Sequence, residues 1–75
     1  HLHKKMTDKL YITNRTNKPI LATISDNNTG NNVINCELQP GQNELVIQHL
    51  NVGVYMMHLH DECDGTFYCQ VLTKE

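Results

Sequence analysis

Two histidines, His58 and His60, occupy alternate positions of an apolar run, and Glu62 follows two residues later. Imidazole and carboxylate groups are ligands that zinc accepts, so this spacing makes the three residues metal candidates. Residues two apart on a strand are separated by about 7 Å, so neighbouring pairs can chelate an ion but all three cannot without another strand. We therefore keep His58 and His60 as candidates, while favouring an exposed polar strand face with no metal and no cofactor.

A cysteine and histidine nucleophile pair is the second chemistry that these residue types offer. If Asp64-Gly65 forms a two-residue hairpin loop, Cys69 lies opposite His60 on the neighbouring strand. Such a pair also needs an oxyanion hole and a substrate cleft, and the sequence carries no signature of either. It contains neither a Gly-x-Ser-x-Gly elbow nor a glycine-rich phosphate loop. The sequence therefore predicts a protein that is not an enzyme.

The three cysteines, Cys36, Cys63 and Cys69, cannot all pair within one chain, and none forms a CxxC motif. In the hairpin register above, Cys63 lies opposite Thr66, which is too far from Cys69 for a relaxed disulfide. We expect half-buried thiols that pack as small hydrophobic side chains, with a Cys63–Cys69 bridge as the alternative.

Composition limits the function classes open to the chain. With six Lys and Arg against eight Asp and Glu, the net charge of -2 supplies no basic face for nucleic acid. No apolar run approaches the roughly 20 residues that a membrane-spanning helix needs. A chain of 75 residues with one Phe and no Trp allows a single domain with shallow, two-layer packing.

Six short runs rich in β-branched and aromatic residues alternate with segments rich in Asn, Gly and Pro. The predicted strands cover residues 9–14, 20–26, 32–38, 43–48, 54–60 and 67–73. A spacing of about ten residues per strand is typical of a sandwich or a barrel.

Alternation within the strands predicts which side chains face the core. Two strands give clear core faces, formed by Tyr55, Met57 and Leu59 and by Ile20, Ala22 and Ile24. The last strand is ambiguous because both of its faces carry apolar residues, namely Phe67, Cys69 and Val71 against Tyr68, Gln70 and Leu72. Apolar residues left on an outer face indicate a surface for a partner.

The order of these features is more specific than any single motif. A strand "DKLYI" is followed by "ISDNNTG" and then by the run "GQNELVIQHLNVGVYMMHLHDECDGTFYCQVLTKE". This nearly full-length pattern resembles the C-terminal sorting domain of proteins exported by the type IX (Por) secretion system of Bacteroidetes. The matching positions are Gly41, Leu50, Gly53, Tyr55, Gly65 and Lys74. The chain departs from the family in its entry "HLHKKMTDKL", in a longer turn at residues 26–30, in its cysteines and in a single terminal lysine.

The resemblance implies an immunoglobulin-like antiparallel β-sandwich of six to seven strands that acts as a secretion signal. It implies recognition by the secretion translocon and by sortase-like processing proteins. The cargo would pass through the periplasm to the outer-membrane surface or the medium. The residues that we expect to contribute to recognition are Gly53, Tyr55, Gly65, Gln70, Val71, Leu72 and Lys74.

Three of the matching positions have predicted roles in the fold. Gly53 permits a tight reversal before its strand, and Gly65 allows a positive φ in the hairpin. The Tyr55 ring contributes to the core, and its hydroxyl can reach the backbone at the edge of the sandwich.

We expect residues 1–6 to be a linker or added residues, and residues 7–75 to form one sorting domain cut from a longer polypeptide. Open edge strands also predict self-association. Two alternative functions remain: an immunoglobulin-like structural or adhesion module of a bacterial surface protein, and a metal-binding domain that uses His58 and His60.

Overall fold

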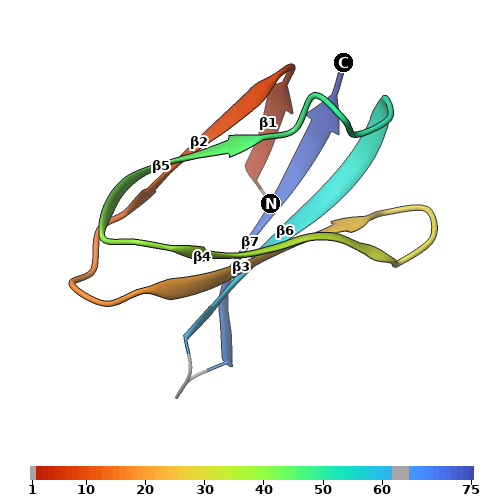
Figure 1. Ribbon diagram of the computed structural model, residues 1–75. Helices are drawn as coiled ribbons and strands as arrows, with labels where there is room; N and C mark the ends of the chain where they lie inside the picture. Colours follow the sequence, from red (N-terminus) through yellow and green to blue (C-terminus); the bar gives the residue numbers. More distant parts are fainter. Residues whose placement is uncertain (1, 62–64) are drawn as a thin grey trace.

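A computed structural model of the chain describes residues 2–61 and 65–75, with the side chains of residues 5–61, 65 and 68–75 (Figure 1). The described residues form strands and connecting turns, and no helix occurs among them. The strands are β1 (Leu2–Met6), β2 (Lys9–Asn14), β3 (Ile20–Asp26), β4 (Asn32–Leu38), β5 (Gly41–Val46), β6 (Gly53–Asp61) and β7 (Gly65–Lys74). The predicted all-β fold is confirmed, and β2, β3 and β4 have the predicted bounds.

The strands form two layers, a five-stranded sheet in the order β1-β7-β6-β3-β4 and a two-stranded sheet of β2 and β5 (Figure 1). In immunoglobulin-like sandwiches, strands C, F and G share one sheet, while B and E belong to the other. Here β3, β6 and β7 occupy the first set of positions, and β2 and β5 occupy the second. All pairs are antiparallel except β1 with β7, which is parallel.

Strand β1 includes residues that the sequence placed outside the domain. It pairs with β7 from Leu2 opposite Gln70 to Met6 opposite Lys74. Met6 is buried, and its carbonyl oxygen accepts a hydrogen bond from the Glu75 N–H at 3.1 Å. Backbone pairing and the burial of Met6 therefore make β1 part of the sandwich, so the folded domain begins before residue 7.

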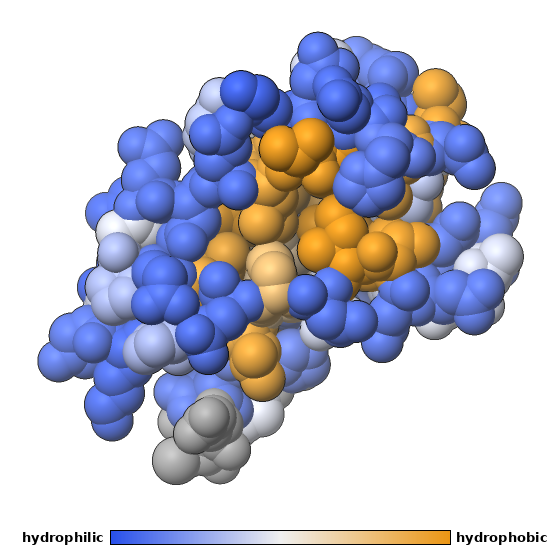
Figure 2. Space-filling view, in the orientation of Figure 1, coloured by the Kyte–Doolittle hydropathy of each residue, from blue (hydrophilic) through white to orange (hydrophobic). Residues whose placement is uncertain are grey.

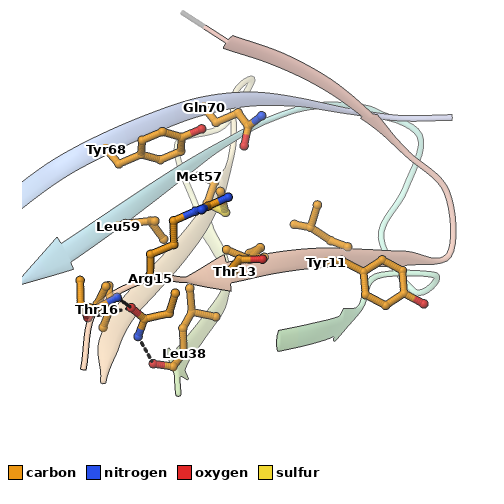
Figure 3. A pocket seen from close by; sticks show the side chains of 13 residues that line it. Tyr11, Thr13, Arg15, Thr16, Leu38, Met57, Leu59, Tyr68 and Gln70 are labelled. Atoms are coloured by element: carbon orange, nitrogen blue, oxygen red, sulfur yellow. Dashed lines mark hydrogen bonds between the residues drawn. The ribbon is translucent and has the colours of Figure 1, made fainter. Parts of the chain in front are cut away.

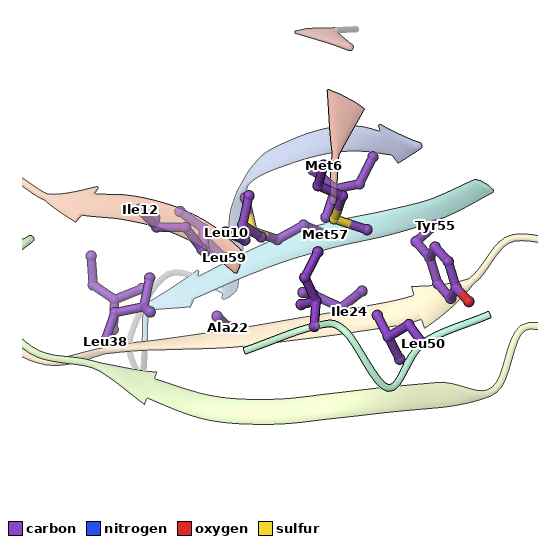
Figure 4. Close-up of a cluster of buried hydrophobic side chains, with 13 residues drawn as sticks. Met6, Leu10, Ile12, Ala22, Ile24, Leu38, Leu50, Tyr55, Met57 and Leu59 are labelled. Carbon is purple, nitrogen blue, oxygen red and sulfur yellow. The ribbon is translucent and has the colours of Figure 1, made fainter. Parts of the chain in front are cut away.

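The core lies between the two sheets (Figure 4). The two predicted core faces, on β3 and β6, are buried as expected. On β7 the structure resolves the ambiguity, because Leu72 is completely buried and belongs to the core. Hydrophobic side chains gather between the sheets, with hydrophilic residues around them (Figure 2). The buried hydrophobic residues are Met6, Leu10, Ile12, Ile20, Ala22, Ile24, Leu38, Ile47, Leu50, Tyr55, Met57, Leu59 and Leu72.

The segment after β5 turns earlier than the predicted strand of residues 43–48. β5 ends at Val46, and the Ile47 N–H donates to the Asp8 carbonyl oxygen at 2.9 Å. The Leu50 N–H then donates to the Ile47 carbonyl oxygen at 3.0 Å. This turn buries both Ile47 and Leu50, whereas a continuing strand would direct them to opposite faces.

Only one of the two glycines with a predicted backbone role needs to be glycine. Gly65 has a φ of 73°, as predicted for the hairpin. Gly53 lies outside the left-handed region, and a Cβ built on it meets no atom within 4 Å. The predicted tight reversal at Gly53 is therefore wrong, because an ordinary residue can adopt this conformation in the available space.

Candidate functional site

The hairpin of β6 and β7 has a different register from the predicted one. Cys69 lies opposite His58 and His60 lies opposite Thr66, because the hairpin closes with Asp61 opposite Gly65 and not around the predicted loop Asp64-Gly65. The predicted pairing of Cys69 with His60 is therefore wrong, and with it the geometry of that nucleophile pair. The pairing also shifts by one residue between Leu59 and His60, as at a β-bulge, and this shift offsets part of the difference from the predicted register.

The structure describes two of the three cysteines, Cys36 and Cys69. Cys36 and Cys69 are half-buried free thiols, as expected of small hydrophobic side chains. Cys36 packs against the core, and burial raises the pKa of its thiol. Cys63 lies outside the described residues, so the Cys63–Cys69 alternative stays a prediction. The predicted two-residue loop Asp64-Gly65 is wrong, because Gly65 belongs to β7 and lies opposite Asp61.

His58 and His60, the two metal candidates, are half-buried and lie two residues apart on β6. The ring centroids of His58 and His60 are 6.3 Å apart. Glu62 lies outside the described residues, and the residues that the structure describes include no group of three or more His, Cys, Asp or Glu that could hold a metal ion. Within that part of the chain, the two imidazoles are a pair without a third ligand.

Burial divides the predicted recognition residues into two groups. Tyr55, Leu72 and Lys74 are buried, so another protein cannot contact their side chains while the domain is folded. Gly65 is exposed, and Val71 is half-buried. Residues that are not buried remain available for direct contact, whereas the buried three act through the fold. Gly53 and Gln70 are also half-buried, and Gln70 lines the pocket described below.

Tyr55 has the hydrogen bond that the sequence predicted. Its hydroxyl donates to the Asn51 carbonyl oxygen at 2.6 Å, while its ring is buried in the core. Burial raises the pKa of the Tyr55 hydroxyl, and the nearby charge of Asp26 adds to the effect. A tyrosine near the start of strand F that bonds the backbone just upstream is the tyrosine corner of immunoglobulin-like sandwiches.

The centre of the outer face of the five-stranded sheet has no charged side chain, whereas Lys5 and Glu37 lie at its edges. At its centre, Thr23, His58 and Cys69 lie in one row across β3, β6 and β7. Ser25, Met56 and Val71 form the next row. None of these six side chains is a Lys, Arg, Asp or Glu. Strand positions that face water usually carry polar and charged residues. A group of outward positions without charge is therefore typical of a contact surface.

A pocket of about 470 Å³ opens beside β2 (Figure 3). We name it the β2 groove. Its lining residues come from β2 and the two residues that follow it, from the inner faces of β6 and β7, from the start of β3 and from the end of β4. They are Leu10, Tyr11, Ile12, Thr13, Asn14, Arg15, Thr16, Ile20, Leu38, Met57, Leu59, Tyr68 and Gln70. Sequence reasoning missed this groove, because alternation does not reveal which edge of a sheet is left open.

Asn14 supports one end of the β2 groove and was also missed. Its side-chain amide donates to the carbonyl oxygens of Lys18 and Leu38 at 2.8 and 3.1 Å. Its Oδ1 accepts bonds from the Thr16 N–H and hydroxyl at 3.0 and 2.7 Å (Figure 3). An asparagine at a strand end, followed two residues later by threonine, was the available signal, since such side chains cap turns.

The fold and these surfaces define a small immunoglobulin-like β-sandwich domain. Comparisons with models of known families, with curated proteins and with solved structures found no match to this chain. The part of the chain that the structure describes has no helix long and apolar enough to span a membrane.

Proposed function

We propose that this domain is a non-enzymatic C-terminal secretion signal that the type IX machinery reads. It would direct a larger cargo protein across the outer membrane and to the cell surface, after passage through the periplasm. The observation that carries the proposal is the bond from the Tyr55 hydroxyl to the Asn51 carbonyl oxygen. This bond lies within "GQNELVIQHLNVGVYMMHLHDECDGTFYCQVLTKE", the most specific stretch of the resemblance to type IX sorting domains.

Four of the other matching positions also have roles in forming the fold, whereas Gly53 has no such requirement. Gly41 and Gly65 have φ values of 99° and 73°, which favour glycine. Leu50, in the turn after β5, and Lys74, at the end of β7, are both buried. A signal recognised as a folded body would keep residues of this kind, because the partner depends on the shape that they maintain.

We place the surface read by the partner on the outer face of the five-stranded sheet, around Val71 and Met56. Both are half-buried apolar side chains in a region without charged neighbours at the adjacent outward positions. Exposed Val54 extends this apolar region along β6 toward the end of β7. Contact surfaces of proteins are depleted of charge at their centres, as this one is.

A reporter fusion tests the proposal. Residues 1–75 are attached to the C-terminus of a periplasm-directed reporter in a type IX-competent strain and in a strain without the translocon. Residue 1 is the starting point because β1 pairs with β7. We expect export to the surface or the medium only from the competent strain, because the machinery must read the domain. Retention of the reporter in the periplasm of both strains would contradict the proposal and favour the structural or adhesion module.

A pair of charge substitutions tests where the domain is read. Val71→Glu places a charge at the centre of the outer face, whereas Val33→Glu places one at an exposed position of the edge strand β4. We expect Val71→Glu to lower export at least about tenfold, while Val33→Glu exports like the natural sequence. Thermal melting of both purified domains shows that they are folded. Equal export by the two variants would exclude this face as the surface that is read.

The metal-binding alternative has its own test. Two imidazoles without a third ligand chelate weakly, so calorimetry should detect no zinc binding tighter than about 100 μM. Tighter binding that disappears in a His58→Ala, His60→Ala double variant would establish a metal site.

A further inference from the structure

We propose that the β2 groove binds an extended, acidic peptide segment, which adds a strand to the open edge of β2. This inference goes beyond the export role and does not depend on it. It rests on three features of the groove: a strand edge with which no other described strand pairs, an apolar floor, and a cation without an ion-pair partner among the described residues.

The first feature is the edge of β2 that faces away from β5. The Ile47 N–H bonds the Asp8 carbonyl oxygen, and the register runs from Lys9 opposite Val46 to Asn14 opposite Gly41. Hydrogen-bonded pairs alternate along an antiparallel ladder, so the peptide groups of Lys9 and Thr13 point away from β5. In the part of the chain that the structure describes, β5 is the only strand that pairs with β2. These peptide groups can therefore pair with an added strand.

The second feature is the floor of the groove. It consists of apolar side chains from two strands, Met57 and Leu59 of β6 and Leu10 and Ile12 of β2. Tyr68 and Gln70 of β7 line the opposite wall (Figure 3). An added strand directs every second side chain toward this floor and the others toward water. The occupant therefore needs apolar residues at alternate positions.

The third feature is Arg15, an exposed residue that follows β2. Figure 3 shows its side chain extending toward the side of the pocket where Tyr68 and Gln70 lie. Its guanidinium makes no ion pair or hydrogen bond with any residue that the structure describes. Lys9, at the other end of β2, already has an ion-pair partner, because its Nζ lies 2.8 Å from the Glu44 Oε1. Arg15 therefore supplies a free positive charge at the groove, which an acidic side chain of the occupant complements.

The same charges argue against a second copy of this chain as the occupant. If two β2 strands pair in antiparallel fashion about Ile12, Lys9 of one copy lies opposite Arg15 of the other. Like charges directly opposite each other on paired strands are destabilising. An acidic partner segment therefore fits this edge better than the edge fits itself.

Two synthetic peptides test the proposal by nuclear magnetic resonance with the ¹⁵N-labelled chain. Both have eight residues of alternating valine and threonine, with one central threonine replaced by glutamate in the probe and by lysine in the control. We expect the glutamate peptide to shift the amide signals of Lys9, Thr13 and Arg15. We also expect it to bind about fivefold tighter than the lysine peptide, as for an exposed ion pair.

Two proline variants separate strand addition from other contacts. Thr13→Pro removes an N–H that points into the groove and leaves the hydrogen-bonded pairs with β5 intact. Gln42, which lies opposite Thr13, has the equivalent position on the outer edge of β5, so Gln42→Pro is the matched control. We expect Thr13→Pro to weaken binding at least about tenfold and Gln42→Pro to leave it unchanged. Arg15→Ala should abolish the preference for glutamate over lysine.

Several results would overturn the proposal. Equal binding of the two peptides to the natural chain would remove the role of Arg15. Signal changes confined to β4 or β5 would place the peptide on another edge. Binding unaffected by Thr13→Pro, in a variant that circular dichroism shows to be folded, would exclude strand addition to β2. Concentration-dependent shifts of β2 amides without peptide would identify a second copy as the occupant.

Discussion

The Tyr55 hydroxyl and the Asn51 carbonyl oxygen are 2.6 Å apart and joined by a hydrogen bond. This bond ties the start of β6 to the turn that follows β5, and so links the five-stranded sheet to the two-stranded one. Ile47 and Leu50 of the same turn are buried in the core. One tyrosine thus fixes the connection around which the two layers close.

Loss of this bond should weaken the fold without destroying it. Tyr55→Phe keeps the buried ring and leaves the Asn51 carbonyl without its partner, so we expect the free energy of unfolding to fall by about 1 kcal/mol. Tyr55→Ala also removes the ring from the core and should cost about 3–5 kcal/mol. Urea denaturation measures both, with exposed Val52→Ala as the control. Unchanged stability of Tyr55→Phe would mean that the corner does not hold the sheets together.

The two glycines should respond differently to alanine. Gly65→Ala forces a side chain into a φ of 73° and should cost about 1–2 kcal/mol. Gly53→Ala meets no atom within 4 Å and has no such φ, so its cost should stay within about 0.5 kcal/mol. Thermal unfolding of the two variants, compared side by side, provides the measurement. A larger loss at Gly53 would reverse the roles that the structure assigns.

Asn14 should matter far more than an ordinary surface asparagine. Asn14→Ala leaves the carbonyl oxygens of Lys18 and Leu38 without their donor, of which the bond to Leu38 is fully buried. We expect a loss of about 2 kcal/mol in the free energy of unfolding. Exposed Asn35→Ala on β4 is the matched control, with an effect within about 0.5 kcal/mol. Equal effects of the two substitutions in urea would refute the structural role of Asn14.

Cys36 should make stability depend on pH in the alkaline range. Burial raises the pKa of its thiol above the ordinary value of 9.0. As pH rises past this value the unfolded chain loses the thiol proton first, so the unfolded state binds fewer protons and the free energy of unfolding falls. Cys36→Ala should flatten this decline above about pH 9 in urea titrations under reducing conditions. The same slope in the variant and in the natural chain would show that the thiol does not contribute.

Much of the fold could be predicted from local signals. Asn-rich and Gly-rich turns delimit β2, β3 and β4, and alternation identified Tyr55 and Ile24 as core residues. Strand β1 escaped prediction because its sequence "LHKKM" has little strand character of its own. It is formed by pairing with β7, a contact between residues that are distant in the sequence. Local propensity does not carry this information.

The candidate site was less predictable than the fold, for the same reason. The hairpin pairs Asp61 with Gly65, which places Cys69 opposite His58, and the Asp-Gly dipeptide that predicted a two-residue turn did not reveal this register. The terminal Lys74 reads as an exposed charge but is buried. The β2 groove exists only because the smaller sheet has two strands. Each of these features depends on how the strands assemble, which one sequence does not specify locally.

The most direct test of the central claim is the fraction of the reporter fused to residues 1–75 that added protease can reach on intact cells. We predict that most of the reporter is accessible in the type IX-competent strain and almost none in the strain without the translocon. Equal accessibility in the two strains would contradict the claim that this sandwich is read as an export signal.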